Sequence, residues 1–429
     1  MAESVEGGRV PERGNPHGMD WTPLRDVGKA EIPVSRYVSD DYYAREKERI
    51  WRRSWLLIGR ESDVSKAGDF FTFYLHVLST LVIVIRGKDG ELRAFHNVCQ
   101  HRGAQIQHEA CGSCRALTCA FHGWVYDLDG SLLNVPQAEQ FEELDYEERK
   151  LKRIHLDTWG GFVFINLDPA DQPEHTLAEW LGPMPGPLGE YFAKENWIWR
   201  VGWKGIFEAN WKIMVDVQLE GYHVNALHAK TIGGVFGPAQ LQNLAFPDTP
   251  GMPTKLEFMR PDISKDKSFR RPIQTPVMKA AVEYGATSPF TDKDASSGGI
   301  PLRANHYPGA INRLDDPLWI FDDYLIFPNV VMMAQTDHIW LQRVWPISPH
   351  RTAWEFEWYF IDWPKNFGEW FAWEQAYCHF RDVTTQDMVN VEGMQKAYRA
   401  GSISTMVVSD IEGGVRCFQD KVTQLVGAE

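Results

Sequence analysis

The chain has 429 residues, more than one hydrophobic core of ordinary size accommodates, so two domains are expected. Its formal net charge of −14 argues against nucleic acid or an anionic membrane as a partner, and no run of about 20 apolar residues predicts a membrane-spanning helix. Six cysteines, and an N-terminal segment without the apolar core of a signal peptide, favour a protein of the reducing cytoplasm.

The first part of the chain predicts an arm followed by a β-rich domain. Its start is polar and rich in Gly and Pro, so residues 1–40 are expected to form a flexible or surface-bound arm. Ser39 is expected to cap a helix over residues 42–55 whose charged side chains mostly face water. From Leu56 the pattern changes to short strands, and the first domain is expected over residues 41–170. Hairpin turns are expected at 88–90 and 127–130, and a closing strand at 155–169.

A Pro-rich segment at residues 183–189 marks the connection to a second, mixed domain, expected over residues 171–429. Long loops with one helix near residues 276–284 are expected to cover a pocket. The other expected elements are a strand at 197–207, a helix at 210–228, consecutive antiparallel strands between 318 and 363, and an aromatic-faced helix at 367–399.

Two short motifs in the first domain have the spacing of metal ligands. Cys99 and His101 form a Cys-x-His pair, and Cys119 and His122 form a Cys-x-x-His pair after seventeen intervening residues. Two thiolates and two imidazoles on paired loops suit a Rieske [2Fe–2S] cluster, in which the cysteines hold one iron and the histidines the other. Because imidazole ligands raise the potential above that of an all-thiolate cluster, such a centre accepts electrons from a ferredoxin-like donor.

Zinc is the main alternative, because Cys111 and Cys114 have the spacing to join the second pair in a zinc ribbon. The first pair would then be idle, and zinc sites rarely begin with a Cys-x-His pair. These two cysteines are therefore expected to be free thiols on a turn, with a second metal or a redox pair as the alternative. Gly103 and Gly123 are expected to let the loops fold tightly and to let backbone N–H groups point at the sulfides of the cluster.

The segments NVCQHRGAQI and CAFHGWVYDLDG resemble the Rieske segment of the large (alpha) subunits of Rieske non-haem iron oxygenases. Respiratory-chain Rieske proteins differ, because they place an additional cysteine where this chain has Arg102, Gly103 and Ala104. The resemblance covers nearly the whole chain from about Asp40. It implies an α+β protein, with an all-β Rieske domain and a catalytic domain whose antiparallel sheet wraps around helices in a helix-grip, START-like arrangement.

The expected helix at 210–228 carries a candidate for a second metal site. Glu220 and His223 share a face of this helix, and His228 reaches them if the helix loosens at its end. Two histidines and one more carboxylate make the facial triad that leaves open positions on Fe(II) for dioxygen. The alternative is a helix with two polar histidines and no metal.

The resemblance points to the missing carboxylate, because NWKIMVDVQLEGYHVNALH is similar to the iron-binding helix of the same family. Many members carry their third ligand, an Asp, about five residues before a Glu and eight before a Gln near the C-terminus. Asp387 in QDMVNVEGMQ matches this spacing with Glu392 and Gln395, and the nearby Asp382 does not. The resemblance thus implies a mononuclear iron held by the two histidines and Asp387.

Glu220 has a different implied role. In the family this acid bridges a cluster histidine and an iron histidine of neighbouring subunits, which here are His122 and His223. Many members use Asp at this point, and the longer Glu looks like the monooxygenase and demethylating branches. Many members also carry Asn where this chain has Asp216, so the polar support of the iron is expected to differ. The bridge implies a homotrimer, with or without a small beta subunit.

The implied function is that of a terminal oxygenase component. The chain has no GxGxxG fingerprint, so electrons from NAD(P)H are expected to arrive through a separate flavin reductase, a ferredoxin or both. Exposed charges near the cluster, such as Arg102 and Arg115, are candidates for docking this donor. With O2 as cosubstrate, the enzyme is expected to hydroxylate or oxidatively dealkylate (O- or N-demethylate) its substrate.

The substrate has to be predicted from pocket composition. The candidate lining residues are apolar or aromatic, which predicts a hydrophobic, aromatic compound. These candidates are Val215, Phe236, Phe290, Ile320, Phe327, Met332 and Phe371. The alternatives are cis-dihydroxylation of an aromatic ring and monooxygenation of a quaternary amine. An electron carrier without chemistry and a zinc-stabilised binding protein are the alternatives from other classes.

Overall fold

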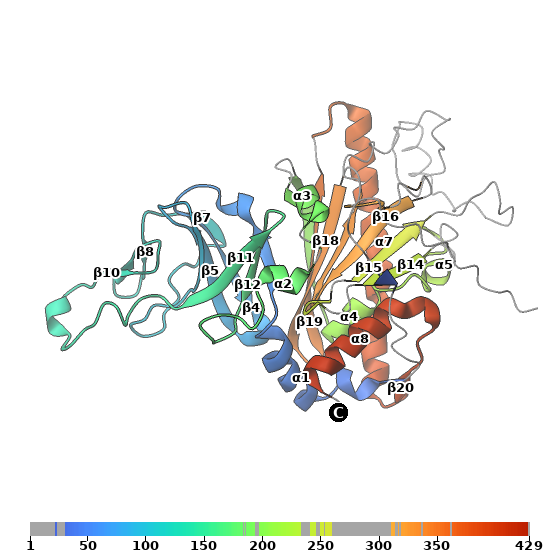
Figure 1. Cartoon of the computed structure of the whole chain (residues 1–429), viewed down its shortest axis with the longest axis horizontal. Helices are drawn as coiled ribbons and strands as arrows, with labels where there is room; N and C mark the ends of the chain where they lie inside the picture. Colours follow the sequence, from blue (N-terminus) through green and yellow to red (C-terminus); the bar gives the residue numbers. More distant parts are fainter. Residues whose placement is uncertain are drawn as a thin grey trace, which may run out of the picture.

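The computed structural model consists of a smaller β-rich body and a larger body built on one wide sheet, side by side in Figure 1. The helix expected near residues 276–284 and two of the predicted pocket residues, Phe236 and Phe290, lie outside the residues that the structure describes. Those described residues are 22–23, 31–182, 184, 186–193, 197–232, 241–245, 249–252, 254–259, 310–313, 316, 319–335, 338–360 and 363–427.

The smaller body is built on a seven-stranded antiparallel sheet of order β3-β12-β11-β6-β5-β4-β7. Its strands are β3 (Leu56–Arg60), β4 (Asp69–Leu75), β5 (Thr80–Arg86), β6 (Leu92–His96), β7 (Cys111–Ser113), β11 (Arg153–Trp159) and β12 (Phe162–Asn166). The hairpin turn expected at residues 88–90 lies between β5 and β6, as predicted. The single closing strand expected at 155–169 is instead a hairpin, because Gly160 and Gly161 turn the chain with φ of 60° and 75°.

A three-stranded sheet consists of β8 (Leu117–Thr118), β9 (Val125–Tyr126) and β10 (Leu132–Asn134). It carries the second candidate cluster motif, Cys119 and His122, between β8 and β9, whereas Cys99 and His101 follow β6. The turn between β9 and β10 lies at residues 127–130, as predicted. Leu117, Tyr126 and Trp124 are buried in a small core of their own, which also contains Cys99 and Cys119. The motif loops are therefore fixed by local packing.

The larger body contains an eight-stranded antiparallel sheet of order β1-β14-β15-β16-β17-β18-β19-β13. Its strands are β1 (Thr22–Pro23), β13 (Ile198–Phe207), β14 (Leu241–Ala245), β15 (Thr254–Met259), β16 (Trp319–Ile326), β17 (Val330–Ala334), β18 (His338–Ser348) and β19 (Arg351–Phe360). The consecutive antiparallel strands expected between residues 318 and 363 are β16 to β19. The antiparallel sheets and the helices confirm the predicted α+β class.

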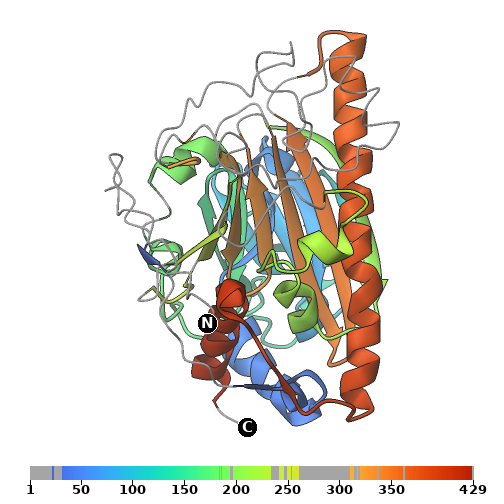
Figure 2. The same ribbon diagram turned by 90° about the vertical axis from the view of Figure 1, so that its right-hand side faces the viewer.

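Helices cover one face of this sheet. The long helix α7 (Phe367–Arg399), whose ends agree with the prediction, runs beside the sheet in Figure 2. Its Phe380 packs against Trp340 and Trp358 of the sheet, with ring centroids 5.9 and 5.1 Å apart. Shorter helices complete the layer: α4 (Trp211–Asp216), α5 (Val224–Leu227) and α8 (Gly413–Val426). None of the helices in the described ranges combines the length and apolar character needed to cross a membrane.

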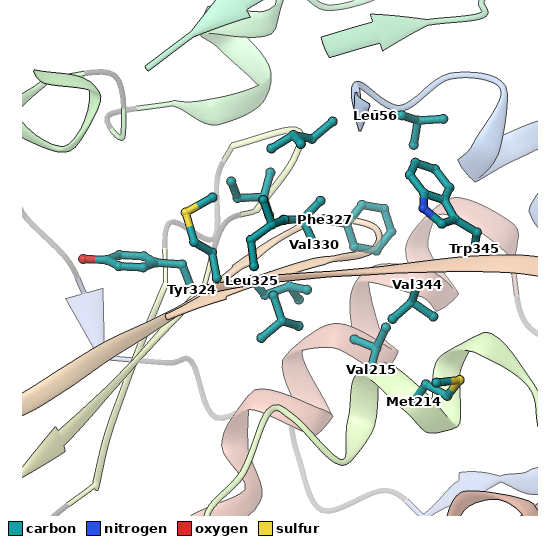
Figure 3. Close-up of a cluster of buried hydrophobic side chains, with 14 of the residues drawn as sticks. Leu56, Met214, Val215, Tyr324, Leu325, Phe327, Val330, Val344 and Trp345 are labelled. Carbon is teal, nitrogen blue, oxygen red and sulfur yellow. The ribbon is translucent and has the colours of Figure 1, made fainter. Parts of the chain in front are cut away.

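The two bodies share one hydrophobic core. Trp345 of β18 packs against Trp51 and Phe73 of the smaller body, with ring centroids 6.2 and 5.0 Å apart. Leu56 lies in the same cluster as Trp345 and Phe327 (Figure 3). Because fully burying each large apolar side chain stabilises by roughly 1.5–3 kcal/mol, this joint holds the two bodies in a fixed relation.

The leading helix is shorter than predicted and its polar face is partly buried. Ser39 caps α1 (Asp40–Glu46) by accepting from the Tyr42 N–H at 3.1 Å, as expected. The chain then continues as a π-helical turn, Lys47–Trp51. Glu46 was expected to face water, but it is fully buried against Trp211 and Lys212. A buried counter-charge from another element, which local periodicity does not report, accounts for the difference.

Candidate active site

The two predicted cluster motifs form matching loops. The Cys99 N–H donates to the carbonyl of Ala104, and the Cys119 N–H donates to the carbonyl of Trp124, both at 2.8 Å. Gly103 and Gly123 close the loops with φ of 78° and 74°, a conformation in which glycine carries no Cβ penalty. Their N–H groups donate to the carbonyls of Cys99 and Cys119, at 3.0 and 2.9 Å. The tight fold of the loops agrees with the prediction, whereas the expected hydrogen bonds from backbone N–H groups to the sulfides of a cluster stay a prediction.

The loops separate thiols from imidazoles. Cys99 and Cys119 are buried, whereas His101 and His122 lie toward the surface. The two Nδ1 atoms lie 3.2 Å apart, so both imidazoles present the same nitrogen to one point. His101 stacks on Trp124, with ring centroids 4.9 Å apart and an angle of 5° between the planes. A buried thiol pair and an outer imidazole pair fit the two different irons of a Rieske cluster.

Tyr126 supports the buried side of this site. Its hydroxyl lies 3.3 Å from Cys99 Sγ, and it accepts from the Gln100 N–H at 3.0 Å. Burial raises the pKa of both the Cys99 thiol and the Tyr126 phenol. When Cys99 is a thiolate ligand it cannot donate, so the Tyr126 O–H must donate to the sulfur. This hydrogen bond stabilises negative charge on the sulfur.

The zinc alternative finds no support. Cys111 and Cys114 are free thiols, and Cys111 is exposed. Within the described ranges, one group of three or more His, Cys, Asp and Glu residues has ligand atoms close enough for a single ion. That group contains no cysteine.

This group consists of His223, His228 and Asp387, whose ligand atoms all lie within 4.8 Å of one another. His223 precedes α5 and His228 follows it, whereas Asp387 comes from the middle of α7. The Asp387 Oδ1 atom lies 3.0 Å from His228 Nε2 and 3.4 Å from His223 Nε2. His228 and Asp387 are buried, with 1% and 7% of their side chains exposed, and His223 is 24% exposed.

The hydrogen bonds of the two Nδ1 atoms show which ring nitrogen of each histidine faces the point where the three ligand atoms converge. The His228 Nδ1 atom lies 2.8 Å from Gln386 Oε1, and the His223 Nδ1 atom lies 2.5 Å from Glu220 Oε1. The amide oxygen of Gln386 and the ionised carboxylate of Glu220 can only accept hydrogen bonds. Both imidazoles therefore carry their proton on Nδ1 and direct the lone pair of Nε2 toward the other ligand atoms. Asp387 Oδ1 has no hydrogen-bond donor. Three electron-pair donors that converge without a proton between them fit a cation, and the two-histidine, one-carboxylate set suits Fe(II).

Burial lowers the pKa of the His223 imidazole, but the hydrogen bond to Glu220 and the charges of Glu220 and Asp387 outweigh burial, so that this pKa is raised overall. The two carboxylates therefore favour a positive charge at this point, which a bound cation would supply in place of a second proton on the ring. Glu220 also accepts from the backbone N–H groups of Tyr222 and His223.

The helix predicted over residues 210–228 is interrupted. It ends at Asp216, and a short second helix begins at Val224. Glu220 accepts N–H groups of the intervening turn, so its side chain stabilises the break. The break lies before His223, so both histidines belong to the second helix, as its N-cap and C-cap, and their ring centroids lie 5.1 Å apart.

Asp382, the alternative carboxylate, faces away from this site. Its side chain is 59% exposed and pairs with Arg381 at 3.0 Å. Five residues along a helix correspond to about 140° of rotation, which puts Asp382 and Asp387 on different faces of α7. Gln386 was not predicted. It lies beside Asp387 in the sequence, but no local pattern marks it as a partner of His228.

A pocket of about 70 Å³, partly open to solvent, lies over the three convergent ligands. Its described lining consists of Val217, Gln218, Glu220, His223, Val224, His228, Ile232, Phe258, Phe321, Asp323, Trp340, Phe380, Val383, Thr384 and Asp387. Of the predicted pocket residues, Val215, Phe327 and Met332 are fully buried in the core and do not line it. Phe371 is also not part of this lining, and the side chain of Ile320 lies outside the described ones. The aromatic character agrees with the prediction, but a strand sequence does not show which face of the sheet meets the helices.

Comparisons with known proteins identify the two bodies. The Rieske [2Fe-2S] domain family matches residues 54–153. The ring hydroxylating alpha subunit (catalytic domain) family matches residues 194–428, which is more than half of the chain.

Individual relatives include oxygenases of two kinds. The glycine betaine monooxygenase oxygenase subunit of Chromohalobacter salexigens is 27% identical over 77% of this chain and 71% of its own length. The biphenyl 2,3-dioxygenase subunit alpha of Rhodococcus jostii is 42% identical over 42% of this chain and 38% of its own length.

A solved structure of a quaternary ammonium Rieske monooxygenase, 20% identical, covers 93% of this chain and 96% of its own with a TM-score of 0.69, so it shares the fold. Together with the two family matches, this shows that the chain belongs to the ring-hydroxylating alpha subunits, the terminal oxygenases that carry a Rieske cluster and a mononuclear iron.

Proposed function

We propose that Cys99, His101, Cys119 and His122 hold the [2Fe–2S] cluster and that His223, His228 and Asp387 hold the mononuclear iron. The observation that carries the second assignment is the convergence of two Nε2 lone pairs and an undonated carboxylate oxygen at one point. When bound there, Fe(II) supplies dioxygen activation at its open coordination positions. The protein residues orient the ligands, receive electrons and exclude water from an apolar pocket.

Glu220 is proposed to link His223 to His122 of the partner subunit. Within one chain the cluster motifs and α5 lie at opposite ends of the molecule in Figure 1, so a direct path inside the chain is unfavourable. Glu220 Oε1 already binds His223 Nδ1, which fixes one half of a bridge. Exposed aromatic residues flank both ends: Phe121 beside His122 is 61% exposed, and Tyr222 beside Glu220 is 63% exposed. A homotrimer that pairs these two surfaces would complete the path.

The proposed reaction is hydroxylation or oxidative dealkylation of a hydrophobic compound with an aromatic or similarly flat apolar part. Phe258, Phe321, Trp340 and Phe380 wall the pocket and support such a substrate. cis-Dihydroxylation is the second candidate, because a biphenyl dioxygenase subunit is among the relatives. A cytoplasmic ferredoxin or flavin reductase is the proposed donor, docking near the exposed Arg102 and Arg115.

Metal and sulfide analysis of anaerobically purified protein tests the assignment. About three irons and about two acid-labile sulfides per chain are expected. Asp387→Ala should lose about one iron and keep its sulfide, whereas the matched control Asp382→Ala should keep all of its iron. Full iron in the Asp387→Ala variant would refute the proposed ligand set.

A further inference from the structure

One carboxylate of the pocket is not accounted for by the metal ligands or the bridge. Asp323 lies on β16, it is 7% exposed, and it lines the same pocket as His223, His228 and Asp387. Its Oδ1 atom is buried and has no hydrogen-bond partner. Leaving a buried polar atom without a partner costs about 1–3 kcal/mol, so the site is complete only when something donates to this oxygen.

Among the described residues, no cationic side chain is paired with Asp323. Its cross-strand neighbours on β15 and β17 are Leu256 and Met333. The described lining of the pocket contains the carboxyl groups of Glu220, Asp323 and Asp387, and within that lining there is no Lys or Arg. Lys255 of β15 is instead paired with Glu257 and Asp322, both at 2.9 Å.

Gln218 adds a second polar group to the same part of the pocket. The indole N–H of Trp354 can only donate, so Gln342 must accept it through Oε1, at 2.8 Å. The Gln342 Nε2 atom then donates to Gln218 Oε1, also at 2.8 Å. This chain fixes the Gln218 amide so that its Nε2 atom, buried and without an acceptor, remains a donor.

A cation fits this environment better than an anion or a neutral hydrocarbon. An anionic ligand would meet the carboxyl group of Asp323, and a hydrocarbon would leave Asp323 Oδ1 without a donor. Phe258 and Phe321 stack with centroids 4.3 Å apart, and Trp340 lies in the same wall, so aromatic faces are available to a cation. Burial and the neighbouring Asp322 raise the pKa of Asp323 well above its usual value, so a positive ligand is what would stabilise its ionised form.

We propose that Asp323 is the specificity-determining residue of this pocket and that it binds a protonated amine with at least one N–H. The inference rests on the proposed function, since it takes this pocket as the substrate pocket. An ammonium N–H donates to Asp323 Oδ1 and its charge faces the aromatic wall. A quaternary ammonium, such as the named substrate of the glycine betaine relative, has no N–H and leaves Oδ1 without a hydrogen bond. The Nε2 atom of Gln218 would donate a hydrogen bond to an acceptor atom of the ligand next to its amine.

Three probes that share a benzyl group, of which the quaternary ion carries one additional methyl group, separate charge from hydrogen bonding. They are N,N-dimethylbenzylamine, which is protonated at neutral pH, the quaternary benzyltrimethylammonium, and the neutral isobutylbenzene. Dissociation constants are measured by titration calorimetry on the anaerobic holoenzyme. The tertiary amine is expected to bind roughly tenfold or more tightly than either of the others, since hydrogen bonds to charged groups are worth about that factor or more.

The variants test the residue itself. In Asp323→Asn the affinity for the tertiary amine should fall by roughly 10- to 100-fold, while that for isobutylbenzene changes less than about threefold. Thr384→Val, which also changes a polar residue of the lining, should keep the wild-type preference. Equal binding of the three probes to the wild type, tighter binding of the quaternary ion, no detectable binding of the tertiary amine, or an unchanged preference in Asp323→Asn would overturn the proposal.

The outcome is independent of the metal assignment. Iron and sulfide analysis of the same preparations reports on the metal ligands, whereas the probe preference reports on Asp323. Protein with full iron and no preference for the amine would refute this inference alone. Protein that lacks the mononuclear iron but prefers the amine would contradict the proposed function alone.

Discussion

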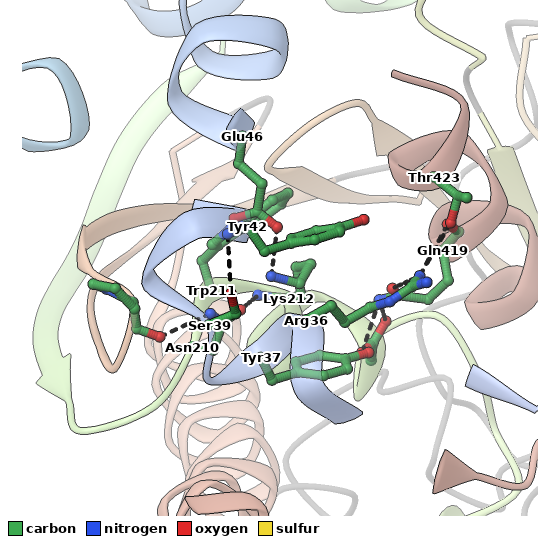
Figure 4. A network of polar contacts seen from close by, with 12 residues as sticks. Arg36, Tyr37, Ser39, Tyr42, Glu46, Asn210, Trp211, Lys212, Gln419 and Thr423 are labelled. Atoms are coloured by element: carbon green, nitrogen blue, oxygen red, sulfur yellow. Dashed lines mark hydrogen bonds and ion pairs between the residues drawn. The ribbon is translucent and has the colours of Figure 1, made fainter. Parts of the chain in front are cut away.

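The buried ion pair between Glu46 and Lys212 ties the leading helix to α4, which precedes the proposed iron ligands His223 and His228 in the chain (Figure 4). Both side chains are fully buried, and Lys212 Nζ lies 2.5 Å from Glu46 Oε1. The second carboxylate oxygen of Glu46 accepts from Trp211 Nε1 at 2.9 Å. Burial lowers the pKa of Lys212, but the nearby Glu46 carboxylate favours its charged form. We predict that removing one partner is far more damaging than replacing both.

The expected change in the free energy of unfolding depends on which charged groups each substitution leaves buried without a partner. Lys212→Met leaves a buried carboxylate with only the Trp211 N–H as a partner, and an uncompensated buried charge costs about 3–5 kcal/mol. The double change Glu46→Gln with Lys212→Met leaves no charge, and the amide oxygen at position 46 still accepts from Trp211. The double variant should therefore lie within about 1–2 kcal/mol of the wild type, because well-packed neutral replacements of buried ion pairs are often close to neutral.

Scanning calorimetry of the holoenzyme measures this difference. A change of 1 kcal/mol shifts Tm by about 2–4 °C in a domain of 150–250 residues, so Lys212→Met should lower Tm by roughly 10 °C and the double variant by only a few degrees. The exposed pair Arg52–Glu48, at 2.8 Å, provides the control, since Arg52→Met should shift Tm by less than about 2 °C. If the double variant lowers Tm by as much as Lys212→Met or by more, the two residues do not form a coupled pair and the reasoning fails.

Three further predictions concern the site and its support. Burial raises the pKa of Asp216 to about 7, above its value of about 3.9 in an unfolded chain, so its contribution to stability is lost as the pH rises through 7. Asp216→Asn should therefore raise Tm relative to the wild type more at pH 8 than at pH 5, and a pH-independent difference would contradict this. Glu220→Gln should keep its iron and sulfide, but in a single turnover that starts from the reduced cluster it should no longer oxidise the substrate. Fast oxidation of the substrate by this variant would exclude a bridging role. Gln386→Leu removes the acceptor of His228 Nδ1–H and should weaken mononuclear iron binding by roughly 10- to 100-fold in chelator competition, with sulfide unchanged as the control.

The parts of the fold that were predictable from the sequence are those with a local cause. The helix α7 has the predicted ends, and the hairpin turns lie at the predicted Gly-containing positions. The strands β16 to β19 follow from runs of β-branched and aromatic residues separated by short breaks. In each case neighbours in the sequence carry the information.

The parts that were not predictable depend on contacts between distant segments. Glu46 belongs to a charged run that reads as solvent-exposed, and only the arrival of Lys212 explains its burial. Gln386 and Asp323 have no local signature, because their roles depend on which face of α7 or of the sheet meets the pocket. Asp387 was indicated by its spacing in the family and not by any physical property of its own segment.

The joint between the two bodies limits where electrons can go. Swinging the cluster loops toward the iron ligands of the same chain would expose Trp51, Phe73 and Trp345, at roughly 1.5–3 kcal/mol for each side chain. A rigid chain with its two candidate metal sites at opposite ends cannot complete the path alone (Figure 1). We therefore infer that the same core that stabilises each chain also makes activity dependent on assembly, so that dilution into monomers should stop turnover before it releases either metal.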